Sequence, residues 1–396
     1  MSDQPPPKFD IPKRRWDIDW LRVLVVFMLI PYHAARIFDF DPFYIKNDEL
    51  TTAFSYLLVS LGDAFAMRLL FLLAGAATWF ALRKRSGGQY AKERVQRLLI
   101  PFIWGLFILV PPITYFALRD HTGYAGSFIE FYPHFFEVGE GGIFLDFAGG
   151  FTFAHLWFIL LLFTCSLLAL PILVLLKRDS GKRAISWLAS ISGLGILILA
   201  GALPGFFEWR FVLTQNPIFP LLEVLIFFIF GFVLMADDRF GEAIDKFRVM
   251  WLIVGPILYL VLGVLRIFVE LPEWLTFSYY HLIFPWFFIL AILAYGKRYL
   301  SFKDGASLSD KFLLYFGEAG YSFYLLHMTV LITIGYFVIQ WNTSIAIKYT
   351  LIVVTTYIGT TAVYELLVRR FNGMRFLFGM RPKRQMPVTN SDREQS

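Results

Sequence analysis

Long runs of apolar residues, separated by short polar segments, dominate the chain between residues 18 and 368. An α-helix needs about 20 such residues to cross the hydrocarbon core of a bilayer. Because only helices and closed barrels span membranes, the pattern predicts an all-α polytopic membrane protein with about ten transmembrane helices. The predicted spans are 18–38, 53–82, 98–118, 152–176, 184–203, 217–236, 250–269, 277–296, 312–340 and 344–368. Gly317 and Gly320 favour a break in the ninth span.

Lysine and arginine gather in alternate loops between these spans. The two terminal segments and the second, fourth, sixth and eighth loops are basic, whereas the other loops carry Lys46, Arg119, Arg210 and little else. Positive loops stay on the cytoplasmic side, so both termini are expected in the cytoplasm. The expected organisation is a disordered N-terminus over 1–13, a ten-helix transmembrane domain over 14–370 and a basic cytoplasmic tail over 371–396.

The composition agrees with a membrane protein and excludes several other classes. Only 17% of the residues are charged, against about 25% in a soluble domain. The net charge of +6 follows from the basic loops and does not indicate nucleic-acid binding. The single cysteine, Cys165, provides no disulfide framework. No nucleotide-binding, serine-hydrolase or zinc-protease motif is present, and no spacing of histidines with carboxylates or cysteine indicates a metal.

Two ionisable residues bracket the apolar part of the first span. Arg22 and His33 are eleven residues apart, which in an α-helix is a rise of about 16.5 Å and three turns plus about 20°. They therefore share one helix face. Asp19 lies three residues before Arg22 and can neutralise it. A cation at the inner end and a titratable base further out suit a long ligand with an anionic head and a reactive far end. Each residue has a simpler interpretation: Arg22 snorkels to the interface, and His33 is a packing residue.

Several stretches, in order along the chain, resemble the membrane-bound acyltransferase-3 family. The first span is similar to that family's Asp-x-x-Arg motif, followed by ten residues and a histidine. The second span departs from the family, with Leu70 for a phenylalanine and Ala74 for a serine. The matching stretches are DWLRVLVVFMLIPYH (19–33), LLFLLAGAA (69–77), ERVQRLLIP (93–101), HLWFILLL (155–162) and YSFYLLH (321–327). The opening DIDWLRVL and FLLAGAATWFAL resemble most the subgroup with glucan-modifying succinyltransferases.

The resemblance implies an O-acyltransferase in a bacterial inner membrane. Acyl-CoA in the cytoplasm would be the donor, and a hydroxyl of an extracytoplasmic glycan or similar envelope molecule would be the acceptor. His33, Arg22 and Asp19 are then the expected catalytic residues, with His33 at the reacting centre. His33 would act either as general base or as a nucleophile that carries the acyl group. The residues alone leave these two routes open.

The remaining candidate residues have binding or supporting roles. Arg94 and Arg97 suit the phosphates of CoA if they share a helix face, although positive-inside charge that binds anionic lipid is the simpler explanation. His327, near Ser322, would orient His33, donate to an oxyanion, bind the acceptor or only pack. His155 and Trp157 are expected at the acceptor side or as interface anchors. Arg68 lies five residues from Asp63, and the two are expected to satisfy each other or neighbouring spans, or to support the site. The residues expected to bind the acceptor or to support the site are His327, Ser322, His155, Trp157 and Arg68.

Two other functional classes remain open from the sequence. A transporter of a polar or anionic solute would use Arg22, Arg68 and Arg266 along its path, and a broken ninth span fits that class. A structural or sensing protein would tolerate removal of His33. Release of free thiol from a donor distinguishes an acyltransferase from both.

Overall fold

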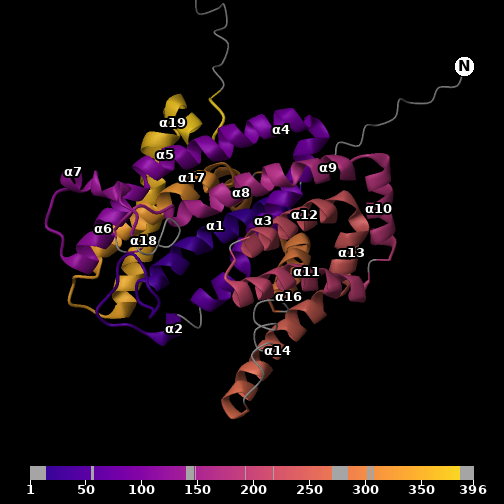
Figure 1. The fold of residues 1–396 in the computed structure, drawn as a ribbon, viewed down its shortest axis with the longest axis horizontal. Coiled ribbons are helices and arrows are strands. Elements are labelled where there is room, and N and C mark those ends of the chain that lie inside the picture. The colour runs from indigo at the N-terminus through magenta and orange to yellow at the C-terminus, as the bar shows by residue number, and fades with distance from the viewer. Residues whose placement is uncertain are drawn as a thin grey trace, which may run out of the picture.

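A computed structural model describes residues 15–54, 58–139, 147, 149–191, 193–216, 218–269, 284–300, 305 and 307–383. The secondary structure of this part of the chain is helical, without strands, and helices occur in all ten predicted ranges (Figure 1). The main helices are α1 (Trp16–Arg36), α3 (Ser60–Lys84), α5 (Ile100–Ile108), α6 (Val110–Thr122), α8 (Trp157–Leu168), α9 (Leu170–Leu176), α11 (Leu194–Thr214), α12 (Ile218–Ala236), α14 (Arg248–Phe268), α16 (Phe284–Tyr299), α17 (Leu308–Val338) and α18 (Ile345–Val363).

Not all of these helices qualify as spans by length and apolarity. Within the described residues six do so on their own, and a seventh results if the bent pair α8–α9 is one span. The protein is therefore a multi-pass membrane protein, while the count of ten stays a prediction. Proline explains the bend: Pro171 is the second residue of α9, at the point where the chain turns by 46°.

Two details of the predicted spans are wrong. The ninth is not broken, because α17 runs without interruption over 31 residues through Gly317 and Gly320. The fifth begins later than 184, because residues 179–190 form a separate amphipathic helix, α10 (Asp179–Ser190), and α11 starts after Gly193. The separate α10 has a mixed polar and apolar composition, which suits a membrane interface better than a span.

Close packing of α3 against α12 depends on two glycines. A Cβ atom on Gly75 would lie 1.8 Å from the carbonyl oxygen of Phe228, and one on Gly231 would lie 1.8 Å from that of Leu72. Small residues let two helix backbones approach, which is the usual device at helix crossings in membranes. The stretch 69–77, which resembles a family motif, thus fixes the position of α3.

The basic loops contact one another. Arg239, in the sixth loop, donates to the hydroxyl of Ser186 at 2.8 Å, and Lys177 donates to the carbonyl of Leu82. Helices α4 (Gly87–Arg94) and α19 (Asn372–Leu377) lie at the upper edge of Figure 1, and the short helix α2 (Thr52–Phe54) lies at the lower edge.

The weakly charged loops also gather. The backbone amide of Lys46 donates to the carboxylate of Asp120 at 2.9 Å, and Lys348 donates to the side chain of Asn47 at 2.8 Å. The basic loops thus lie together, and so do the weakly charged loops, as expected if the two sets lie on opposite sides of the membrane. The cytoplasmic placement of the basic set stays a prediction.

Candidate active site

Three histidines from distant parts of the sequence come together inside the helix bundle. His33 lies in α1, His155 in the short helix η4 (Ala154–Leu156) and His327 in α17. The ring centroids of His33 and His327 are 5.3 Å apart, as are those of His155 and His327. The structure therefore unites His33 with two of its expected supporting residues.

Backbone carbonyls determine which nitrogens of two rings carry the proton. His327 Nδ1 lies 2.7 Å from the carbonyl oxygen of Tyr324, and His155 Nε2 lies 3.1 Å from that of Leu325. A carbonyl oxygen can only accept, so these nitrogens donate, and the other nitrogen of each neutral ring is an acceptor.

The second nitrogen of each of these two rings, and one nitrogen of His33, have no hydrogen-bond partner in the described part of the chain. His327 Nε2, His155 Nδ1 and His33 Nδ1 are all buried, and no hydrogen bond reaches them from the described part of the chain. Buried polar atoms without a partner are costly, and native proteins rarely keep them without a functional reason. The cluster is thus suited to receive hydrogen bonds from a bound molecule or from a proton held between the rings. No group of three His, Cys, Asp or Glu side chains among the described residues is arranged to hold a metal ion.

A cavity of about 140 Å³ opens beside this cluster. Helices α1, α3 and α17 and the start of α8 form its wall. One end is polar, where the hydroxyl of Tyr32 donates to the carboxylate of Asp63. The other end is apolar. Its lining is Leu29, Tyr32, His33, Gly62, Asp63, Ala66, Met67, His155, Trp157, Phe158 and Tyr324.

Of the two alternatives expected for the charges of α3, the structure shows pairing of Arg68 with a neighbouring helix. Arg68 does not pair with the carboxylate of Asp63. Its Nε donates to Glu223 of α12 at 2.6 Å, and its Nη1 donates to the backbone carbonyl of Asp63 at 3.1 Å. Five residues along a helix put the two side chains on different faces, so Arg68 reaches across the glycine crossing to the next helix. Arg68 thus holds the backbone that carries Asp63 at the wall of the small cavity.

The loop after α1 covers the histidine cluster. The ring of Phe43 stacks on that of His33 with centroids 6.1 Å apart. Lys46 anchors this loop, since its ammonium group donates to Asp39 at 2.9 Å and its amide to Asp120 at 2.9 Å. Burial lowers the pKa of Lys46, and the hydrogen bond with Asp39 opposes that change.

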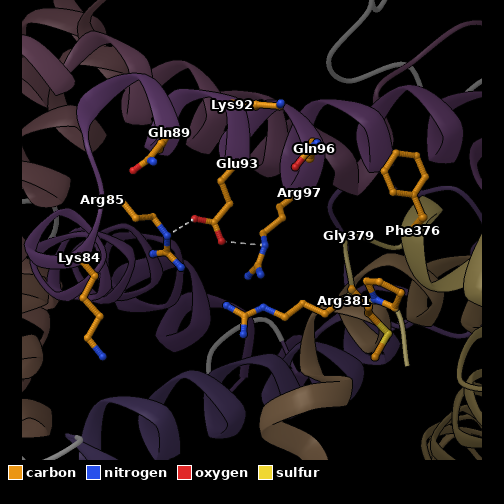
Figure 2. A pocket seen from close by; sticks show the side chains of 12 residues that line it. Lys84, Arg85, Gln89, Lys92, Glu93, Gln96, Arg97, Phe376, Gly379 and Arg381 are labelled. Carbon is orange, nitrogen blue, oxygen red and sulfur yellow. Dashed lines mark ion pairs between the residues drawn. The ribbon is translucent and has the colours of Figure 1, made fainter. Parts of the chain in front are cut away.

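A second, larger cavity of about 670 Å³ lies between α4 and the C-terminal segment (Figure 2). Five of its twelve lining residues are basic and one is acidic. Figure 2 shows Arg85, Arg97 and Arg381 converging near the carboxylate of Glu93, which pairs with Arg85 at 3.0 Å and with Arg97 at 3.1 Å. The basic residues of its lining are Lys84, Arg85, Lys92, Arg97 and Arg381. Cations outnumber the single acidic group, so the cavity is suited to bind an anion.

The two predicted phosphate-binding arginines do not share a face. Arg97 lines the basic cavity, whereas the guanidinium of Arg94 lies over the ring of Tyr90, 4.5 Å from its centroid, and is not part of the lining. The cause is local: residues 95–99 form a π-helical turn, η2 (Val95–Leu99), which rotates the chain between the two arginines.

Arg94 instead lies near a buried tyrosine of α17. The Nε of Arg94 and the hydroxyl of Tyr321 are both buried and have no hydrogen-bond partner in the described part of the chain. The ring of Tyr321 also touches the backbone at Gly379, part of the basic cavity's wall. One helical turn further along α17, Tyr324 lines the small cavity. Tyr321 is therefore positioned between the two cavities.

Three other predicted site residues lie apart from both cavities. Arg22 pairs with Asp19 at 3.1 Å, as expected from their spacing, and its side chain is 44% exposed. Ser322 is buried, and its hydroxyl donates to the sulfur of Met380 at 3.4 Å. Neither Arg22, Asp19 nor Ser322 lines either cavity.

Sequence reasoning missed several residues that the structure puts at the two cavities. Tyr32 was visible as a neighbour of His33, but nothing in the sequence indicated its bond to Asp63. Glu93 begins the stretch 93–101, directly before Arg94, but nothing in the sequence indicated its pairing with Arg85. Arg381 lines the basic cavity, and Tyr321 lies against Gly379 of its wall, through the packing of α17 and the C-terminal segment, which has no local signal.

Comparison with known proteins now identifies the family. No curated protein and no solved structure matches the chain. A family model described as an acyltransferase domain, that of the acyltransferase-3 family, matches residues 15–365 of the 396. This match includes all three clustered histidines and the helices that form the small cavity. The chain belongs to the acyltransferase-3 family and is a membrane acyltransferase.

Proposed function

We propose that this acyltransferase moves an acyl group from cytoplasmic acyl-CoA to a hydroxyl of an extracytoplasmic glycan or a similar envelope acceptor, with His33 at the reacting centre. The observation that carries the proposal is the pairing of two different cavities. One holds His33 among unpartnered histidine nitrogens, and the other is cationic. We assign the protein to a bacterial inner membrane, with its termini in the cytoplasm.

The basic cavity suits the phosphates of the donor. Arg85, Arg97 and Arg381 offer planar guanidinium groups, which bind phosphate oxygens with two parallel hydrogen bonds. The amide-rich arm of CoA would then pass Arg94 and Tyr321, whose unpartnered donors can bond to its carbonyl oxygens. This route brings the thioester to the small cavity beside Tyr324.

As a general base, His33 would act on the acceptor hydroxyl. A lone pair of its ring takes the hydroxyl proton while the oxygen attacks the thioester carbonyl. The carbon–sulfur bond then breaks, CoA leaves as thiolate, and the proton on His33 returns to that sulfur. No net charge or proton is left on the protein.

As a nucleophile, His33 would take the acyl group first. Its ring nitrogen forms a bond with the carbonyl carbon, the carbon–sulfur bond breaks, and CoA leaves as thiolate. The acceptor hydroxyl then attacks the acyl carbon, the carbon–nitrogen bond breaks to regenerate the ring, and the hydroxyl proton is released to balance the one that the CoA thiolate takes up. The geometry suits both routes, because each needs one unprotonated nitrogen of His33 facing the small cavity.

His327 would orient His33 and not donate to an oxyanion. Its only proton is committed to the carbonyl of Tyr324, so its Nε2 can accept but cannot donate. If Nε2 accepts a hydrogen bond from the Nδ1–H of His33 through a water, the other nitrogen of His33 keeps its lone pair for the reaction. The third member of a catalytic triad has the same effect on its histidine.

The acceptor would enter at the polar end of the small cavity. Trp157 offers a flat aromatic surface and Asp63 a carboxylate, the two kinds of group to which a sugar can bind by stacking and by hydrogen bonds from its hydroxyls. The transporter alternative loses one of its supports, because α17 is continuous.

Measurement of thiol release tests the proposal. We would purify the full chain in nanodiscs, add membrane extract as a source of acceptors, and follow free CoA thiol from a panel of acyl-CoAs. The expected result is thiol release that falls by about 10²- to 10⁴-fold in His33→Ala.

The exposed His134, which pairs with Glu137 on the surface at 3.0 Å, provides the matched control. His134→Ala is expected to keep the wild-type rate. Equal rates in wild type and His33→Ala, or no thiol release with any donor, would contradict the proposed role of His33.

A further inference from the structure

We propose that the small cavity restricts the donor to a short, uncharged acyl group, and that Ala66 and Met67 set the limit on its length. This inference rests on the proposed function, because it assumes that the thioester carbonyl lies beside His33. It names a property of the substrate that the family does not determine.

The cavity has an apolar end for the acyl chain. Tyr32 of α1 lies against Gly62 and Asp63 of α3, and the two helices run in opposite directions. One turn away from this polar contact, Leu29 therefore faces Ala66 and Met67. An acyl chain whose carbonyl lies at His33 would place its methyl end against these apolar side chains. The acceptor hydroxyl would then occupy the polar end of the cavity.

The volume leaves room for only a few carbon atoms. The whole cavity is about 140 Å³, and an apolar cavity of about 150 Å³ in another protein accommodates one benzene molecule, about six carbon atoms. The thioester carbonyl and the acceptor hydroxyl must occupy part of this space. An acetyl group then fits, a butyryl group fills the apolar end, and an octanoyl group does not enter.

The lining also disfavours an acyl group with its own carboxylate. Neither lysine nor arginine is among the residues that line the cavity, and Asp63 already accepts the Tyr32 hydroxyl at its polar end. The nearest cations in the described part of the chain, Arg36 and Arg68, lie outside the lining and already pair with Asp39 and Asp41 and with Glu223. A succinyl group would bring an anion into a site whose described lining offers no cation to pair with it, which is costly. The cavity therefore argues against the succinyl donor that the resemblance to glucan-modifying enzymes suggests.

A comparison of four donors tests the inference. With the full chain in nanodiscs and membrane extract as acceptor source, we would measure kcat/KM for acetyl-, butyryl-, octanoyl- and succinyl-CoA. The expected result is that acetyl-CoA is preferred and that octanoyl- and succinyl-CoA react at least tenfold less well.

Two variants move the limit in opposite directions. Met67→Ala enlarges the apolar end and is expected to raise the octanoyl-to-acetyl ratio of kcat/KM at least fivefold. Ala66→Val shortens it and is expected to lower the butyryl-to-acetyl ratio by a similar factor. Met250→Ala, at a half-buried methionine of α14 outside the cavity, is the matched control and is expected to leave both ratios unchanged.

The outcomes separate this inference from the proposed function. If no donor releases thiol, the proposed function fails. If thiol release depends on His33 but all four donors react equally well, or succinyl-CoA is preferred, the function stands and the size and charge limit is wrong. Unchanged ratios in both Met67→Ala and Ala66→Val would remove these residues from the limit.

Discussion

The two cavities of this acyltransferase differ in almost every physical property. The cavity between α4 and the C-terminal segment is large, about 670 Å³, and lined by five basic side chains and one acidic one. The cavity at His33 is about 140 Å³ and lacks lysine and arginine. The first can attract an anion from a distance, and the second can exclude water around a reacting carbonyl. This difference indicates that the donor is bound in one cavity and reacts in the other. A substitution in one cavity should therefore change either donor binding or the rate of acyl transfer, but not both.

One helix contributes to both cavities, so displacing it should damage both. Helix α3 supplies Asp63 and Met67 to the small cavity and Lys84 to the basic one. Gly75→Ala adds a Cβ atom 1.8 Å from a backbone carbonyl of α12. We expect a loss of about 3 kcal/mol of stability, despite the better helix propensity of alanine, together with loss of thiol release. Thermal unfolding in detergent measures the loss of stability.

Gly317 of α17 is the matched control for that substitution. A Cβ atom there meets nothing within 4 Å, so Gly317→Ala should be neutral or stabilise the helix by up to about 1 kcal/mol. Equal stability of the two variants would show that the α3–α12 crossing does not position the cavities.

Removal of the orienting histidine should impair the chemistry alone. His327→Leu is expected to lower kcat for thiol release about 100-fold with KM for the donor unchanged, because the lone pair of His33 is no longer directed. His327→Gln keeps an acceptor oxygen and should recover part of the rate. A rise in KM with unchanged kcat would mean that His327 binds substrate instead.

Removal of a guanidinium from the basic cavity should impair binding alone. We expect Arg97→Ala to raise KM for acetyl-CoA about tenfold with little change in kcat, because a charge-assisted phosphate contact is lost. S-acetylpantetheine, which lacks the nucleotide and its phosphates, should react equally well with both proteins. If Arg97→Ala also weakens use of this truncated donor, the cavity does not bind the nucleotide end.

The smallest expected effect lies between the cavities. Tyr321→Phe removes a buried hydroxyl that has no partner in the described part of the chain. Without donor, the variant should be as stable as the wild type or more stable by about 1 kcal/mol. Its affinity for acetyl-CoA should fall about threefold to tenfold by calorimetry. A less stable variant with normal affinity would remove Tyr321 from the donor path.

Much of this arrangement was predictable because long apolar runs have one physical solution in a bilayer. The positions of most helices follow from them, and so does the pattern of loop contacts. The sequence also singled out His33, His155 and His327, because ionisable side chains in apolar surroundings are exceptional. It did not show that they meet, since their convergence depends on how α1, η4 and α17 pack.

The residue placements that the sequence did not predict have identifiable physical causes. The π-helical turn at 95–99 separates Arg94 from Arg97, and an α-helical spacing rule cannot anticipate it. The sequence left open whether Arg68 pairs with Asp63 or with a neighbouring span, and the close crossing of α3 and α12 selects Glu223. The contribution of Arg381 depends on α19 folding back against α5, a tertiary contact between distant segments. In the last two cases, the packing of helices decided which residues come together, which the local sequence left open.

The most direct test of the central claim is a structure of the protein with a non-hydrolysable acetyl-CoA analogue. Our account predicts phosphates against Arg85, Arg97 and Arg381, an arm that passes Tyr321, and an acyl carbon beside His33. An analogue bound in the basic cavity with its acyl end directed away from His33, or bound outside both cavities, would contradict it.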